Sequence, residues 1–149
     1  MSGDPRMSTH TERGEQAAQI SREMVKFMRK IAGRGPTKAR TTIGRDHVLV
    51  MFQDTLTQGE RNLVQNGHED QVQALRSAYQ KLLRADASAM IEEVLDRRVI
   101  GFMSDNHFEP DMAAEVFMLD PRDEPANNVP QEAEHNTDGD RPADGDRPD

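Results

Sequence analysis

Residues 31–40, Ile-Ala-Gly-Arg-Gly-Pro-Thr-Lys-Ala-Arg, mark a change in the pattern of the sequence. A helix-period pattern of apolar residues ends just before Gly33, and an alternating strand pattern begins at Lys38. Gly33 is typical of the first residue beyond a helix, and Pro36 prevents the helix from resuming. The stretch therefore predicts the junction between an N-terminal helix and the first strand of a sheet.

The elements on either side of this junction follow from the spacing of apolar residues. Apolar residues recur every three or four positions over residues 14–32, which predicts an amphipathic helix. Residues 38–43 alternate as a strand with one wet face. Residues 47–53 are apolar on both faces, so we expect that strand to be central in the sheet or covered by a partner.

Further along the chain, Thr57 and Glu60 form a Thr-x-x-Glu capping box at the start of a short helix that ends near residues 66–67. Residues 69–96 have a helical pattern whose phase is disturbed near residue 85, so they form two helices or one bent helix. Its apolar positions are Val72, Leu75, Tyr79, Leu82, Leu83, Met90, Ile91, Val94 and Leu95.

The last elements are strands at residues 99–103 and 113–119, joined by a loop over residues 104–112. Alternation in the first of them puts Val99 and Met103 on one face and Ile100 and Phe102 on the other. The order α-β-β-α-α-β-β predicts a two-layer α+β fold. In it, two β-hairpins form a four-stranded antiparallel sheet, and the helices pack on one face.

The sheet has more apolar residues than one helical layer requires. They are Val48, Val50, Phe52, Ile100 and Met103. We therefore expect a homodimer formed through the sheet or its edge.

The chain has 149 residues, and its composition predicts one domain over residues 14–120 between disordered segments at 1–13 and 121–149. Residues 120–149 hold 10 acids and 3 bases, a charge of −7, whereas residues 1–119 hold 17 acids and 16 bases, a charge of −1. The net charge of −8 thus belongs to the acidic tail, rich in Pro, Gly and Asp. We hypothesise that this tail folds back over the basic residues described next.

The region around the opening stretch is strongly basic. Residues 22–45 hold eight cations and one acid, a local charge of +7, which attracts anions. Gly33, Arg34, Gly35, Lys38 and Arg40 are the candidate residues for binding an anion or an acidic partner. The alternative is a helix end and turn with solvated cations. The stretch is no phosphate-binding loop, because it follows a helix instead of opening one.

A second candidate is the segment holding Asp105, His107, Glu109 and Asp111. Its carboxylates could hold a hard cation, and His107 with Asp105 could act as an acid–base pair. The alternative is an ordinary turn, since the spacing fits no calcium loop and Asp, Asn and Pro are turn residues. We assign no catalytic residue, no metal site and no cofactor. Nucleic-acid binding is not expected, because the few aromatics form no stacking platform.

Other classes are excluded by composition. The chain has no cysteine, so disulfides and thiolate metal sites are absent. No signal peptide is evident, and the longest apolar run, residues 48–52, is far below the ~20 residues that span a bilayer. We expect a cytoplasmic protein.

Several short motifs, taken in order, resemble one family. They are Gly-Arg-Gly-Pro at 33–36, Leu-Thr-Gln-Gly-Glu-Arg at 56–61, Asp-Arg-Arg-Val-Ile-Gly-Phe-Met-Ser-Asp at 96–105 and Glu-Val-Phe-Met-Leu at 115–119. Together they resemble the MpsC-type family, named after a sodium-translocating, membrane-potential-generating system, over about residues 14–121. Gln58 departs from the family pattern, which has proline there. Ala85-Asp86-Ala87 replaces a break in relatives, which favours a more continuous helix.

The resemblance implies a cellular context without a reaction, and it carries no catalytic residue or cofactor onto this chain. Ion translocation requires spanning elements, which the sequence lacks. We therefore expect a non-enzymatic accessory or regulatory protein, peripheral to the membrane and bound to a membrane-protein partner. The alternatives are a small metal- or phosphate-dependent enzyme using residues 105–111, and an anion- or nucleic-acid-binding module.

Overall fold

The first helix, α1 (Pro5–Ala32), turns one apolar stripe toward the rest of the chain. The structure is a computed structural model that describes residues 5–124, with side chains described from residue 11. Ile20, Met24 and Met28 recur every four residues and are buried. The helix begins at Pro5, earlier than the predicted residue 14, so regular structure extends into the segment predicted to be disordered.

The predicted end of this helix is confirmed. Gly33 has a φ of 79°, and its N–H donates to the carbonyl of Arg29 at 2.9 Å. Gly35 allows a close approach, because a Cβ there would lie 3.2 Å from Cγ1 of Val25. The chain then enters the sheet at Lys38.

The sheet has four antiparallel strands, as predicted: β1 (Lys38–Ile43), β2 (His47–Gln53), β3 (Val99–His107) and β4 (Met112–Leu119). Their order is β1-β2-β4-β3, so the two hairpins join through β2 and β4. The strand that is apolar on both faces, β2, is therefore central, which agrees with the sequence.

The predicted loop over residues 104–112 is wrong, because β3 continues to His107 and β4 already begins at Met112. Ser104 and Asn106 have low strand propensity, yet they pair with Glu115 and Ala113 across the ladder. Tertiary pairing thus overrides local preference.

The predicted face assignment at the start of this strand is also wrong. A β-bulge between Val99 and Gly101 shifts the alternation. As a result Val99 and Phe102 pack against the core, while Ile100 and Met103 are exposed.

Two more helices complete the second layer. The capping box of α2 (Gln58–Gln65) is confirmed, with both reciprocal hydrogen bonds of Thr57 and Glu60 present. The next helix, α3 (Glu69–Leu95), is continuous, which decides between the two predicted alternatives. Asp96 ends α3 in the left-handed region with a φ of 52°.

A 3-10 helix, η1 (Pro121–Asp123), follows β4 and extends the ordered chain past the predicted boundary at residue 120. The acidic tail from residue 125 onward lies outside the described residues.

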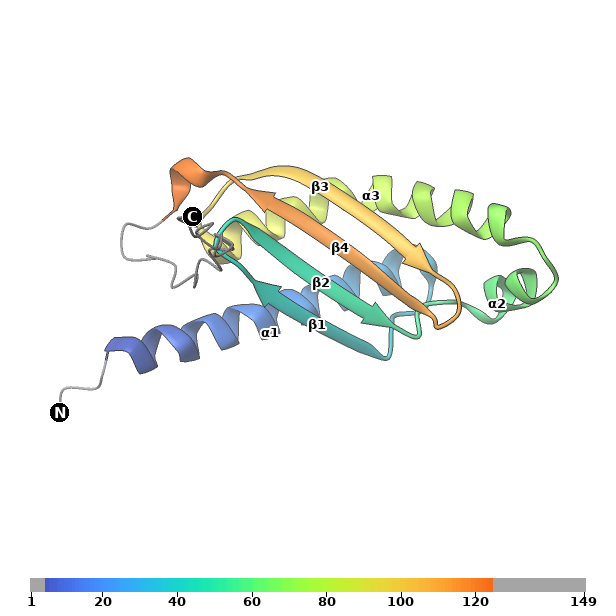
Figure 1. Cartoon of the computed structure of the whole chain (residues 1–149), viewed down its shortest axis with the longest axis horizontal. Helices are drawn as coiled ribbons and strands as arrows, with labels where there is room; N and C mark the ends of the chain where they lie inside the picture. Colours follow the sequence, from blue (N-terminus) through green and yellow to red (C-terminus); the bar gives the residue numbers. More distant parts are fainter. Residues whose placement is uncertain (1–4, 125–149) are drawn as a thin grey trace, which may run out of the picture.

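Both long helices, α1 and α3, lie behind the sheet in Figure 1 and cover one of its faces. The core between these layers is apolar and contains Ile20, Met24, Met28, Val48, Val50, Phe52, Leu83, Ala87, Met90, Ile91, Ala113, Phe117 and Leu119. Part of the predicted α3 stripe is wrong, because Leu75 and Leu82 are exposed, Leu82 to 66%. Within residues 5–124, no helix lies on the opposite face of the sheet.

Candidate functional site

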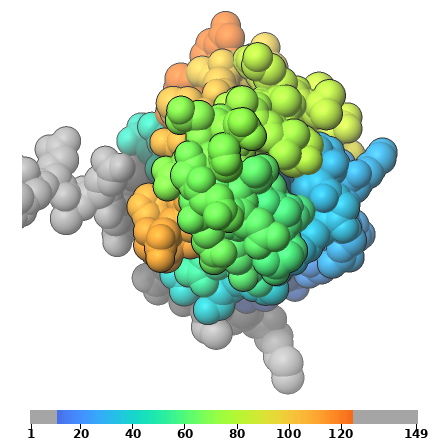
Figure 2. All heavy atoms as spheres, turned by 90° about the vertical axis from the view of Figure 1, so that its right-hand side faces the viewer, coloured from blue at the N-terminus to red at the C-terminus, as the bar shows by residue number. Residues whose placement is uncertain are grey.

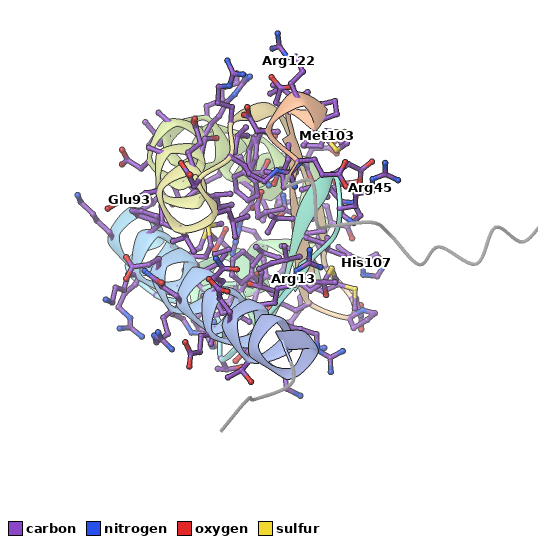
Figure 3. All side chains as sticks on the ribbon, turned by 90° about the vertical axis from the view of Figure 1, so that its left-hand side faces the viewer. Arg13, Arg45, Glu93, Met103, His107 and Arg122 are labelled. Carbon is purple, nitrogen blue, oxygen red and sulfur yellow. The ribbon has the colours of Figure 1, made fainter. Side chains whose placement is uncertain are left out.

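The open face of the sheet is the face turned away from α1 and α3. In Figure 3 the helices lie on one side of the strands, while Met103 and His107 project from the other. The side chains on this face alternate with the buried ones. They are Lys38, Arg40, Thr42, His47, Leu49, Met51, Gln53, Ile100, Met103, Asp105, His107, Met112, Ala114, Val116 and Met118.

The apolar side chains of the open face gather on the two central strands. Leu49 and Met51 of β2 lie beside Val116 and Ala114 of β4 in the ladder register. The exposed Met103 continues this strip onto β3, beside Val116. Charged side chains stand only on the two edge strands. An apolar centre with a polar rim is the usual composition of a protein interface.

The predicted anion site at Gly33, Arg34, Gly35, Lys38 and Arg40 is divided by the fold. Lys38 and Arg40 are exposed on the open face of β1. The guanidinium group of Arg34 lies elsewhere, with Nη1 donating to the carbonyls of Asp54 at 3.0 Å and Leu56 at 2.7 Å.

Arg34 thereby clamps the segment that leads from β2 to α2. Its Nη2 donates to Oδ2 of Asp54 at 2.7 Å, and this hydrogen bond is the main cause that lowers the pKa of the Asp54 carboxyl. Arg61 donates to the other oxygen of Asp54 at 3.0 Å. Two cations on one carboxylate hold the end of α1 and the start of α2 together.

The second predicted set, Asp105, His107, Glu109 and Asp111, is also spread out. Asp105 and His107 are exposed on β3, and Nδ1 of His107 pairs with the carbonyl of Pro110 at 2.8 Å. Asp111 turns inward and accepts from Oγ1 of Thr55 at 2.8 Å and from N of Leu56 at 2.9 Å. Among residues 5–124, no group of three or more His, Cys, Asp or Glu side chains is placed to hold a metal ion.

Sequence reasoning missed a buried ion pair between α2 and α3. Arg76 is 1% exposed, and its Nε donates to Oε2 of Glu60 at 2.7 Å. Its Nη2 donates both to Oε1 of Glu60 at 2.9 Å and to the carbonyl of Thr55 at 2.7 Å. Since Glu60 also caps α2, one carboxylate serves both helices. The available signal was the position of Arg76, four residues after the buried Val72 and seven before Leu83.

Figure 2 looks onto this end of the molecule, where α2 and the start of α3, in green, lie between the β3–β4 loop and α1. The contacts described above join all of these segments. The motifs at 33–36 and 56–61 therefore have a structural role at this end of the molecule.

A second buried acid, Glu115, points from β4 into the covered side of the sheet and is 1% exposed. Burial raises the pKa of Glu115 to about 7, against smaller lowering effects of the Ser104 hydroxyl and the Arg76 charge. Among the described residues, Oε2 of Glu115, Oγ of Ser104 and Nη1 of Arg76 have no hydrogen-bond partner of good geometry. Protonation of Glu115 is therefore the chemistry that this cluster supports.

The opposite end of the sheet carries its own charged cluster. Arg97 donates from Nη1 to the carbonyl of Arg45 at 2.6 Å and from Nη2 to that of Asp120 at 3.3 Å. Arg122 lowers the pKa of the Asp120 carboxyl to about 2 through hydrogen bonds. An open pocket of about 360 Å³ lies here and is lined by Glu92, Asp96, Arg97, Arg98 and Asp123. Two of these charged residues pair with each other, Arg98 with Asp123 at 3.0 Å.

The fold and these surfaces define a small two-layer α+β domain whose most distinctive surface is an open sheet face with charged edges. The chain belongs to the MpsC family, since the model of that family, described as Na+-translocating membrane potential-generating system (MpsC), matches residues 12–121. The resemblance and the predicted fold class are thus confirmed. Neither the curated proteins nor the solved structures contain a match. No helix within residues 5–124 has the length and apolarity needed to cross a membrane.

Proposed function

We propose that this chain is a non-enzymatic accessory protein of a Na+-translocating, membrane-potential-generating system, peripheral to the membrane and held on an acidic surface of a membrane-protein partner. The family description supplies the context. The observation that carries the proposal is the exposed basic face of α1, formed by Arg22, Lys26, Arg29 and Lys30.

The cations of this face are available for a partner. Within the described residues, the side chains of Arg22, Arg29 and Lys30 form no hydrogen bond or ion pair, and that of Lys26 pairs only with Glu23, at 3.2 Å. They lie on the side of α1 that faces away from the core, so an acidic partner can reach them without disturbing the packing of the helix. Exposed charges of one sign accelerate and orient association with an oppositely charged surface.

The predicted partner site at residues 33–40 enters this proposal in part. Lys38 and Arg40 add two exposed cations on the edge strand β1. Arg34 would contribute charge without direct contact, since its donors are occupied by Asp54 and Leu56. The five residues of that site remain the proposed neighbours of the partner, together with α1.

A matched pair of double variants tests the proposal. Arg29→Gln with Lys30→Gln removes two of the four cations of the α1 face, and Lys81→Gln with Arg84→Gln removes two cations from an exposed part of α3. We expect the α1 variant alone to bind native membranes with an affinity lower than that of the wild type by roughly tenfold or more. Binding of the wild type should weaken as the salt concentration rises. Affinity purification from the native cell, with and without detergent, then identifies the partner.

Equal losses in both variants, or binding unaffected by salt, would contradict the proposal. Binding to protein-free vesicles of anionic lipid at the strength seen with native membranes would assign the face to lipid instead of a protein. The tail competition predicted from the sequence concerns residues outside the described part and remains a hypothesis.

The alternative of an enzyme using residues 105–111 has less support. Asp111 is occupied by Thr55 and Leu56, while Asp105 and His107 lie on the open face. An activity abolished by Asp105→Ala and His107→Ala in a folded protein would revive it. The predicted homodimer is supported by the open apolar face.

A further inference from the structure

The open face exposes large apolar side chains to solvent, as an interface does in the absence of its partner. Ile100 is 61% exposed and Met103 56% exposed, although both are large and apolar. With the seven residues of β2 as its length, a four-stranded face measures roughly 19 Å by 24 Å. This flat area of roughly 460 Å² per partner, before side-chain relief is counted, corresponds to a specific interface at the small end of the range.

The register of the ladder reveals how charge is distributed across this face. One row crosses all four strands and reads Arg40 on β1, Met51 on β2, Ala114 on β4 and Asp105 on β3. The row thus begins with a cation and ends with an anion. The two lie on opposite edges, roughly 14 Å apart, so they cannot pair within one chain.

The neighbouring row has the same apolar centre. It reads Thr42, Leu49, Val116 and Met103 from β1 to β3. The boundary between β2 and β4 divides every row into two halves of two strands. A two-fold axis along that boundary, parallel to the strands, would lay each row over the same row of a second molecule in reverse.

We infer that the open face binds a second copy of this chain about a two-fold axis that runs between β2 and β4. Arg40 then faces Asp105 of the second copy, and the symmetry repeats this pair. At the centre, Leu49 faces Val116 of the second copy, and Met51 faces Ala114. Sheets packed face to face lie about 10 Å apart, a gap that an arginine and an aspartate span together. A surface that is positive at one edge and negative at the other is self-complementary.

Two other occupants fit the face less well. The tail at residues 125–149 holds only Ala126, Val129, Ala133 and Ala143 as apolar residues, too few for an apolar strip. A membrane surface favours a rim of one positive sign, whereas Asp105 stands on the β3 edge. The inference assigns Arg40 to the second copy, and in the dimer the membrane role proposed above rests on α1 and Lys38.

Charge-reversal substitutions in the whole chain test the proposed pairing of Arg40 with Asp105 of the second copy. Arg40→Asp and Asp105→Arg each turn both edge pairs into repulsive pairs. We expect either change to raise the dimer Kd roughly 10- to 100-fold, as measured by light scattering over a range of concentrations. Circular dichroism monitors folding, and both sites are exposed.

The two rescues are specific to the proposed axis. The double variant Arg40→Asp with Asp105→Arg restores both pairs and should recover the wild-type Kd within a few-fold. An equimolar mixture of the two single variants should form a heterodimer, because one chain then carries both anions and the other both cations. Neither rescue arises from contacts within one chain.

Leu82→Glu supplies a control on the exposed stripe of α3, and it should leave the dimer intact. The inference is overturned if the wild-type chain is a monomer at high micromolar concentration. It is equally overturned if the mixed variants stay monomeric, or if Leu82→Glu alone dissociates the dimer, which would assign the interface to α3.

Discussion

The two faces of the sheet are made by the same strands, yet one is filled and the other is open. In β2, Val48, Val50 and Phe52 point into the core, while Leu49 and Met51 point the other way. Both sets are apolar, but α1 and α3 cover only the first. Apolar content alone therefore does not define the core, because the helices within residues 5–124 cover only one of the two faces.

The two faces also differ in where their charged groups lie. The covered side encloses ionisable groups, the Glu60–Arg76 pair and the neighbouring Glu115. On the open side, charges such as Arg40 and Asp105 stand at the edges in water. The covered side should therefore govern stability and its pH dependence, and the open side should govern association.

The largest expected effect comes from comparing substitutions at two adjacent residues of β4 that point to opposite faces of the sheet. Phe117 is fully buried, and its ring centroid lies 5.0 Å from that of Phe102. Phe117→Ala should lower the free energy of unfolding by about 4 kcal/mol, because it leaves a cavity. Val116→Ala, on the open face, should cost less than about 1 kcal/mol. Urea denaturation at low protein concentration measures both, and similar losses would erase the distinction between the faces.

The buried ion pair provides the next largest effect. Arg76→Ala leaves Glu60 buried without its cation, which should lower the free energy of unfolding by roughly 3 kcal/mol. Arg98→Ala provides the control, because Arg98 pairs with Asp123 in an exposed cluster. Its loss should be small. If both substitutions cost the same in denaturation experiments, the Glu60–Arg76 pair does not support the covered face.

Glu115 should make the covered face sensitive to pH. Because its pKa rises from 4.5 to about 7 on folding, the folded protein keeps a proton that the unfolded chain releases. Stability from this group is complete below pH 4.5, falls between pH 4.5 and about 7, and is constant above. The total loss is roughly 3 kcal/mol.

Glu115→Gln removes this ionisation, so the variant should match the wild type at acidic pH and exceed its stability at pH above about 7. Asp105→Asn, on the open face, should leave the pH profile of the wild type in place. Thermal melts across this pH range measure the difference. A profile for Glu115→Gln that still falls between pH 4.5 and 7 would show that another group titrates.

Much of the fold could be predicted from the sequence, because its signals are local. Apolar spacing gave the helices, alternation gave the strands, and Thr57 with Glu60 gave the start of α2. The second half of β3 could not be found this way. Ser104, Asp105 and Asn106 favour turns, and only pairing with β4 makes them a strand.

The candidate sites were less predictable, because they depend on contacts between distant residues. The pairing of Arg76 with Glu60 requires α2 and α3 to fold against each other. The row that joins Arg40 to Asp105 requires the neighbour relation of β2 and β4, and local patterns do not specify which hairpin strands meet. Arg34 was singled out for its charge, but its role as a clamp depends on where Asp54 lies.

The smallest expected effect concerns the glycine that sends the chain from the covering helix into the sheet. Gly33 has a φ of 79°, which costs other residues conformational energy, so Gly33→Ala should lower the free energy of unfolding by about 1 kcal/mol. Gly14→Ala is the matched control, because Gly14 lies inside α1 with open space around it. It should stabilise the protein by about 0.5 to 1 kcal/mol. If the two substitutions shift the denaturation midpoint in opposite directions, Gly33 fixes the direction in which the chain leaves α1. If both shift it in the same direction, the end of the helix adjusts freely.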